Sequence, residues 1–153
     1  MINKLMYVAV PLAGVALLMA ACTENPVDGD DHSAHAEAEA MLVTIGSDTL
    51  LHQHEDQGIL TKNGITVTTG EETAPITVQF GDHEGDLFQP AEDHFSLNVT
   101  SDDPEIAEVH TAGNRWEFTL EGKSQGSTSV EVKLMHGDHP DFTGEKIQVN
   151  VSG

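Results

Sequence analysis

Residues 130–134 read Val130-Glu131-Val132-Lys133-Leu134, with an apolar side chain at every second position and a charged one between. Successive side chains of a β-strand point to opposite faces, so this alternation is typical of a strand with one buried face. The same period recurs on both sides of the stretch, at Ile65 and Val67, at Ile76, Val78 and Phe80, at Phe95, Leu97 and Val99, at Trp116, Phe118 and Leu120, and at Ile147, Val149 and Val151. The pattern predicts a domain of half-buried strands.

Turn-forming residues separate these strands, and no segment between them has the spacing of an amphipathic helix. The turn signals are Asn63-Gly64, Thr69-Gly70, Gly81 to Gly85, Ser101 to Pro104, Gly113-Asn114, Gly122 to Gly126, and Gly137 to Pro140. Short strands at this spacing favour two antiparallel sheets packed face to face. We therefore predict an all-β fold, an antiparallel β-sandwich over residues 41–153, with Phe95, Trp116 and Phe118 in its core.

Two short motifs within residues 95–135 resemble those of bacterial Ig-like domains of the group 2 type. Ser101 to Val109 follows that family's Ser-x-Asp-x-x-x-Ala-x-Val pattern, and Gly122 to Val132 is similar to its Gly-x-x-x-Gly-Thr-x-x-Val pattern. The chain departs from the family at Leu97, where tryptophan is often found, and in the further strand at Ile147 to Val151. The resemblance implies an Ig-like sandwich, a scaffold that does not fix function.

The first 22 residues have the features of a bacterial lipoprotein signal in the expected order. Lys4 precedes an apolar run from Leu5 to Ala21, which Pro11 interrupts. The segment Leu18-Met19-Ala20-Ala21-Cys22 resembles a lipobox, with Met19 where leucine is usual. The resemblance implies cleavage after residue 21 and lipid on Cys22, the only cysteine in the chain. Acyl chains on Cys22 would anchor the protein in the lipid bilayer.

Residues 22–40 form the predicted linker, because Val27 is their only large apolar side chain before the strands begin. Such a segment buries too little apolar surface to order itself. We therefore expect a signal peptide at 1–21, a lipidated cysteine with a flexible acidic linker at 22–40, and the sandwich at 41–153. The expected location is the cell envelope, facing the periplasm, in the outer membrane or at the cell surface. Thr23 lacks the aspartate that, by resemblance to enteric lipoproteins, retains a lipoprotein in the inner membrane.

Charge and missing motifs exclude several function classes. The chain has 26 acidic and six basic residues, a formal net charge of −20. Such a protein repels nucleic acid, whose binding requires a cationic surface, and attracts cations or basic partners. The one Gly-x-Ser-x-Gly spacing, Gly122 to Gly126, falls in a predicted turn between two strands and not at the strand-to-helix elbow that a nucleophile requires, and no glycine loop opens a helix to bind phosphate. We therefore expect no nucleic-acid partner and no enzymatic activity.

Histidine is the unusual residue, with nine in the chain. In His136-Gly137-Asp138-His139-Pro140-Asp141, two imidazoles and two carboxylates lie in a segment that a tight bend can fold around one ion. His52 and His54 lie on the same side of a predicted strand. Imidazole suits zinc or copper, so His136, Asp138, His139, Asp141, His52 and His54 are the candidate metal ligands. The alternative is that these histidines only keep polar loops soluble.

Asp82-His83-Glu84-Gly85-Asp86 invites a calcium interpretation, since oxygen ligands alternate there around a glycine. Its spacing does not match the twelve-residue EF-hand loop. A hairpin turn accounts for the same residues and is the preferred interpretation.

Two functions of different classes follow. The first is a non-enzymatic, membrane-anchored envelope lipoprotein that binds divalent transition metal ions through its histidine and aspartate loops, for example for a transport partner. The alternative is an Ig-like structural or interaction module without metal, which contacts another envelope protein or a glycan through loops or a sheet edge. A third hypothesis is that protonation of the histidines removes much of the negative charge.

Overall fold

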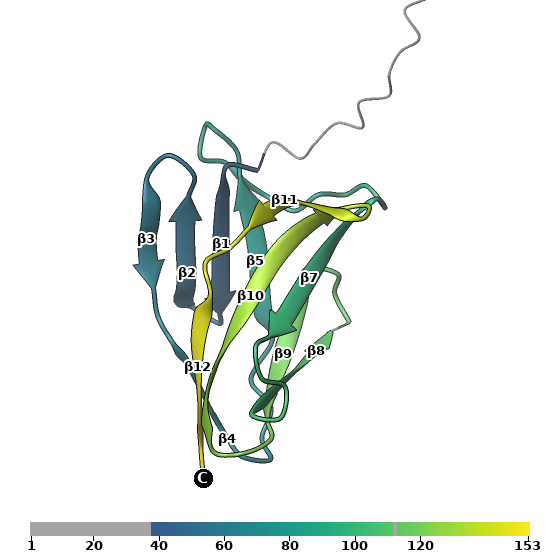
Figure 1. Ribbon diagram of the computed structural model, residues 1–153. Coiled ribbons are helices and arrows are strands. Elements are labelled where there is room, and N and C mark those ends of the chain that lie inside the picture. Colours follow the sequence, from purple (N-terminus) through teal and green to yellow (C-terminus); the bar gives the residue numbers. More distant parts are fainter. Residues whose placement is uncertain (1–37, 112) are drawn as a thin grey trace, which may run out of the picture. The chain divides into compact units, whose positions relative to one another are not determined.

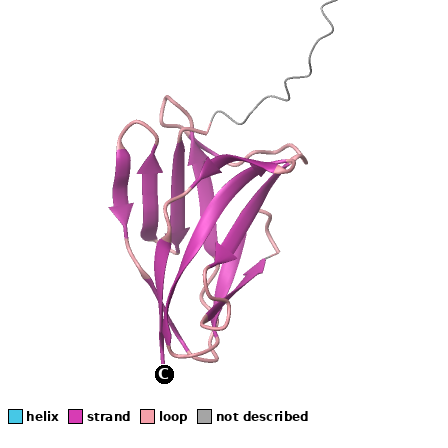
Figure 2. Cartoon of the chain, in the orientation of Figure 1, coloured by secondary structure: helices cyan, strands magenta, loops and turns pink. Residues whose placement is uncertain are grey.

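The computed structural model describes residues 38–111 and 113–153, so the predicted signal peptide, Cys22 and most of the predicted linker lie outside the described residues. The described chain is built from strands and loops (Figures 1 and 2). It includes no helix of the length and apolarity that a membrane crossing requires. The strands are β1 (Ala40–Ile45), β2 (Asp48–His54), β3 (Gly58–Lys62), β4 (Ile65–Thr68), β5 (Ile76–Gly81), β6 (Leu87–Phe88), β7 (Phe95–Ser101), β8 (Ala107–Thr111), β9 (Glu117–Gly122), β10 (Gly126–His136), β11 (His139–Thr143) and β12 (Ile147–Ser152).

The strands form two sheets, which confirms the all-β sandwich prediction. One sheet has seven strands in the order β3-β2-β1-β5-β9-β8, with β6 beside β5. The other has five strands, in which β10 pairs with β7, β11 and β12, and β4 pairs with β12. All of these strand pairs are antiparallel except β4 and β12, which run parallel. In Figure 1 the five-stranded sheet lies in front of the seven-stranded one.

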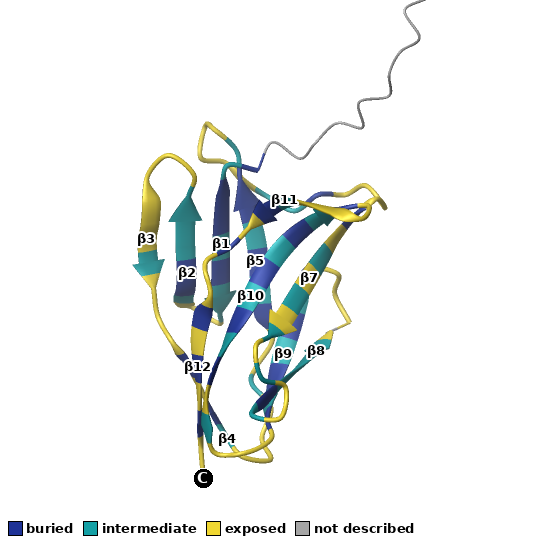
Figure 3. Cartoon of the chain, viewed as in Figure 1, coloured by how far each residue is buried: buried dark blue, intermediate teal, exposed yellow. Residues whose placement is uncertain are grey.

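β10 is the longest strand and carries the alternation that predicts the fold. Val130, Val132 and Leu134 are fully buried, and the residues between them are half-buried. From Thr128 to His136, every second residue of β10 is buried (Figure 3). The apolar alternation therefore marks the core face of the sheet correctly.

The aromatic side chains fill the space between the sheets, as predicted. Trp116 is 5% exposed and meets the Phe80 ring edge-on, with ring centroids 5.7 Å apart. Phe95 and Phe118 are buried as well. An edge-to-face contact of this kind adds to the stability that burial of the rings provides.

β1 and β3 extend the larger sheet beyond the strands that the sequence pattern located, and β2 is the strand predicted at His52 and His54. β1 lies between β2 and β5, with Met41 and Val43 fully buried. The pairing starts before residue 41, because the Glu39 N–H donates to the Gly81 carbonyl oxygen at 2.9 Å. The ordered domain thus includes residues 38–40, which the sequence analysis placed in the linker.

Gly122, on β9 of the larger sheet, lies directly against β4 and β12 of the smaller sheet. Gly70 follows β4 by two residues, and its N–H donates to the Gly122 carbonyl oxygen at 2.7 Å. A Cβ atom on Gly122 would lie 2.6 Å from the Thr68 carbonyl oxygen and 2.9 Å from Val151 Cγ1. Any larger residue would force backbone atoms apart. The glycine that begins the second Ig-like motif is therefore required for steric reasons.

We therefore expect Gly122→Ala to lower the free energy of unfolding by about 1–3 kcal/mol, the usual range for overpacking a close contact. Denaturant unfolding followed by circular dichroism measures this. Gly113→Ala is the matched control, since a Cβ there meets no atom within 4 Å. Equal stability of the two variants would contradict the steric role of Gly122.

Candidate metal centre

The hairpin of β10 and β11 carries four of the predicted metal ligands. His136 ends β10 and pairs with His139, the first residue of β11, across the loop Gly137-Asp138. Gly137 has a φ of 58°, which the first loop position of a type II′ hairpin turn requires. The tight turn sets the two imidazoles side by side, with ring centroids 5.1 Å apart.

Asp141 joins these histidines because β11 contains a bulge. Leu134 pairs with Phe142 and Met135 pairs with Pro140, so Asp141 is the extra residue. Adjacent side chains of a regular strand point to opposite faces. The bulge allows both Asp141 and Phe142 to turn inward: the Asp141 side chain is 4% exposed, and Phe142 as a residue is also 4% exposed.

The Asp141 carboxylate lies between the two imidazoles. Oδ2 is 3.8 Å from His136 Nδ1, and Oδ1 is 3.7 Å from His139 Nδ1. One ligand atom from each of the three residues lies within 4.8 Å of the other two. Ligand atoms around a tetrahedral zinc ion, with bonds of about 2.0–2.1 Å, are about 3.3–3.5 Å apart. Small side-chain shifts would bring the three atoms to coordination distance.

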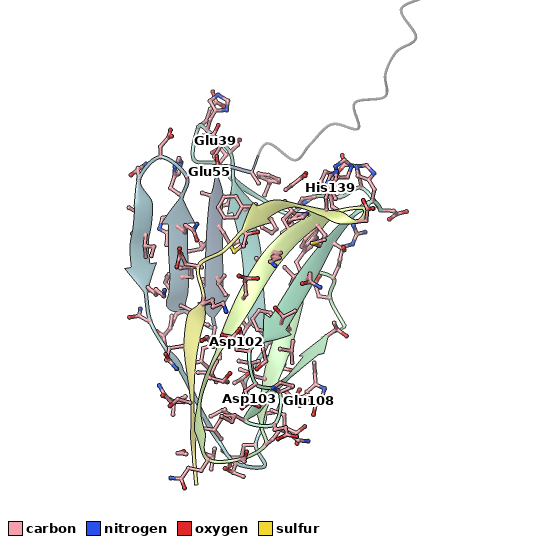
Figure 4. The ribbon with its side chains drawn as sticks, viewed as in Figure 1. Glu39, Glu55, Asp102, Asp103, Glu108 and His139 are labelled. Carbon is pink, nitrogen blue, oxygen red and sulfur yellow. The ribbon has the colours of Figure 1, made fainter. Side chains whose placement is uncertain are left out.

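The surroundings of this cluster are apolar on one side and open on the other. His136 is 6% exposed, and its ring stacks on Phe95 with centroids 4.9 Å apart. The His139 side chain is 53% exposed, at the end of the hairpin (Figure 4). A carboxylate as buried as that of Asp141 is costly unless a positive charge lies close to it. A metal ion held by the imidazoles would supply that charge.

The other predicted ligands lie elsewhere. Asp138 lies in the turn, exposed to solvent, and does not belong to the cluster of His136, His139 and Asp141. His52 and His54 lie on β2, where the Asp56 N–H donates to His54 Nδ1 at 3.3 Å. Neither of them belongs to the three groups of convergent potential ligands that the described residues contain.

His94 is a neighbour of the cluster that the sequence analysis did not select. Its ring centroid is 4.9 Å from that of His136, and the Gly137 N–H donates to its carbonyl oxygen at 2.8 Å. The sequence does show that His94 directly precedes the predicted strand at Phe95, and therefore that it lies at the end of a strand. Only the pairing of Phe95 with His136 brings His94 to the hairpin.

A second group of potential ligands, Glu108, His110 and Glu121, already contains a cation. Lys123 Nζ lies 3.2 Å from Glu121 Oε1 and 3.3 Å from Glu108 Oε2. The hydrogen bond from Lys123, followed by that from His110, holds the pKa of the Glu121 carboxyl below its usual value. This cluster is an ion-pair network rather than a metal centre.

The acidic loop at residues 82–86 is a turn held by its own side chain. Asp82 Oδ1 accepts hydrogen bonds from the N–H groups of Glu84 and Asp86, both at 2.9 Å. This is the arrangement by which aspartate closes a turn. The structure therefore agrees with the turn interpretation of this loop.

No protein-family model matches the chain, and no curated protein matches it. Among solved structures, it is similar to domains 4 and 5 of the S-layer protein SbsC, with 28% identity and a TM-score of 0.46, over 60% of this chain and 49% of that one. A structure of domains 4–9 of SbsC has 30% identity and a TM-score of 0.44, over 60% of this chain and 13% of that one. A structure of domains 1–6 has 19% identity and a TM-score of 0.44, over 79% of this chain and 21% of that one. The chain thus spans less than half the length of each of these structures.

Proposed function

We propose that this chain is a non-enzymatic β-sandwich module of the bacterial cell envelope, tethered by lipid on Cys22, which contacts another envelope protein through the edge formed by β3. The observation that carries this proposal is the exposure of two neighbouring apolar side chains, Ile59 and Leu60, on the outermost strand of the larger sheet. Each is 47% exposed, in a domain whose other large apolar side chains, apart from Leu87, are at least partly covered.

The charge pattern around β3 supports a contact role for this edge. Residues 57–70 contain neither aspartate nor glutamate, although the chain carries 26 acidic residues. Lys62 is the charged side chain of the strand, and its Nζ atom lies 3.6 Å from Glu145 Oε2. A pocket of about 420 Å³ lies where β3 leads into β4, lined in part by Asn63, Gly64 and Ile65. Asp48 also lines this pocket, so the acid-free surface is the strand itself. An exposed apolar strand without acidic side chains fits a protein partner, because exposed apolar side chains become buried on association.

The contact would be made by side chains rather than by strand addition. Thr61 pairs with His52 and Ile59 pairs with Gln53, so Leu60 is the extra residue of a bulge. Bulges prevent a further strand from pairing evenly along an edge. The strand also lacks the aromatic rings on which sugars stack, so its chemistry favours a protein over a glycan.

We expect Leu60→Lys to abolish this contact. A photo-crosslinking amino acid at Thr61 should give one discrete adduct in cells that produce the full chain, and Leu60→Lys should remove it by placing a charge in an apolar interface. Leu87→Lys is the matched control, because Leu87 is also 47% exposed but lies on β6. Mass spectrometry of the adduct distinguishes a partner protein from a second copy of this chain. An adduct that persists in Leu60→Lys would refute the role of β3.

The tether is tested separately. We expect labelled palmitate to be incorporated into the full chain and the protein to sediment with membranes, since two or three acyl chains hold a protein firmly in a bilayer. Cys22→Ser should lose the label and release the protein, whereas Thr23→Ser should retain both. A Cys22→Ser variant that stays labelled would contradict the lipid anchor.

Binding of a divalent transition metal is a second candidate function, favoured by one specific observation. That observation is the convergence of His136, His139 and Asp141, with ligand atoms within 4.8 Å of one another. An imidazole and carboxylate set suits zinc and copper. The buried carboxylate of Asp141 would offset part of the ion's charge.

Calorimetric titration of the purified full chain with zinc or copper chloride tests this function. We expect saturable binding that His139→Ala weakens by at least about tenfold, because even residues that only support a ligand contribute that much. His139 is exposed, so this change leaves the core intact. The double variant His52→Ala/His54→Ala, which removes two imidazoles from β2, is the control and should bind as the unaltered chain does. Loss of binding only in the β2 variant would move the site to that strand.

A further inference from the structure

We propose that His94 is the fourth ligand of this centre, so that His94, His136, His139 and Asp141 hold one zinc ion in a closed tetrahedral site. This inference rests on the proposed metal-binding function and adds the missing ligand, the choice of metal and a structural role. The ligand comes from the segment before β7, which is far in sequence from the β10–β11 hairpin.

Two of the three imidazole ring spacings fit one tetrahedral ion. With zinc–nitrogen bonds of about 2.0–2.1 Å and tetrahedral angles, two imidazoles on the same ion have ring centroids about 5 Å apart. The centroids of His136 and His139 are 5.1 Å apart, and those of His94 and His136 are 4.9 Å apart. Both pairs therefore have the separation of imidazoles that share an ion, and closure of the site requires the His94 ring to reach the same separation from that of His139.

The backbone of His94 is fixed close to the hairpin. Its carbonyl oxygen accepts the Gly137 N–H at 2.8 Å, and its neighbour Phe95 pairs with His136. On the other side, Arg115 Nη1 donates to the Glu92 carbonyl oxygen at 2.8 Å. The segment that carries His94 is thus attached both to the hairpin and to the loop that precedes β9.

The side chain of His94 must rotate for the site to close. Its nitrogens do not belong to the group of atoms within 4.8 Å that His136, His139 and Asp141 form. His94 is exposed, and an exposed side chain changes rotamer within nanoseconds. A rotation that turns one of its nitrogens toward the hairpin would complete the set of four ligands.

The chemistry of the four ligands favours zinc over copper. Three neutral imidazoles and one carboxylate leave a single positive charge on a divalent ion. Zinc accepts four tetrahedral nitrogen and oxygen ligands in structural sites, whereas copper(II) prefers tetragonal arrangements. A site with four protein ligands keeps no open position for catalysis. The ion would therefore link the start of β7 to the hairpin and stabilise this end of the sandwich.

Cobalt(II) substitution tests the geometry directly. Cobalt chloride added to the full chain should give the intense visible bands of a four-coordinate ion. In His94→Ala we expect weaker bands, typical of a higher coordination number, and a loss of zinc affinity of about 10–100-fold. His83→Ala, which removes another exposed loop histidine, should leave both spectrum and affinity unchanged.

His94→Cys provides a test that does not depend on a loss of metal binding. A thiolate is a good zinc and cobalt ligand, so this variant should recover tight binding and add a thiolate-to-cobalt charge-transfer band that the unaltered chain lacks. Zinc should also raise the melting temperature of the unaltered chain more than that of His94→Ala, because binding to the folded state stabilises it.

The outcomes separate the two proposals. Absence of any cobalt or zinc binding in the unaltered chain would refute the metal-binding function itself. Binding with the same affinity and spectrum in His94→Ala, together with no charge-transfer band in His94→Cys, would refute only the role of His94.

Discussion

The alternation of side chains along β10 is the constraint on which the rest of the structure depends. Every second residue from Thr128 to His136 faces the space between the two sheets, and Val130, Val132 and Leu134 are fully buried there. The same alternation continues to the end of the strand, so the side chain of His136 is buried as well. An imidazole thus occupies a position that packing alone would assign to an apolar residue.

Local backbone geometry at the end of β10 supplies the polar surroundings for this imidazole. A glycine with positive φ closes the hairpin so tightly that His139 lies opposite His136. The bulge in β11 then turns Asp141 toward both rings without displacing Phe142 from the core. Two irregular features of a regular sheet therefore create the candidate centre, as is common where bulges border functional sites.

The distribution of charge divides the domain into regions with different uses. Acidic residues are spread along the chain and some form ion pairs with its few cations, as in the contacts of Asp102 with Lys146 and of Glu121 with Lys123. The segment 57–70 departs from this pattern and exposes Ile59 and Leu60 instead. Figure 1 places β3 at one edge of the larger sheet and the β10–β11 hairpin in the other sheet. The two proposed functions therefore use separate surfaces of one scaffold.

The sequence by itself determined the fold class and most of the core, because burial in a sheet leaves a period of two that can be read from the residues. It also identified His136, His139 and Asp141 as neighbours, since six consecutive residues cannot lie far apart. It did not distinguish Asp138 from Asp141, because the inward orientation of Asp141 depends on a bulge whose register involves both strands. The tertiary structure alone decided the place of His94, which lies 42 residues before His136 in the numbering and reaches it only through the antiparallel pairing of β7 with β10. A hairpin turn sets the register of the two strands that it joins, but β7 and β10 are not consecutive, so their pairing depends on the packing of the whole sandwich.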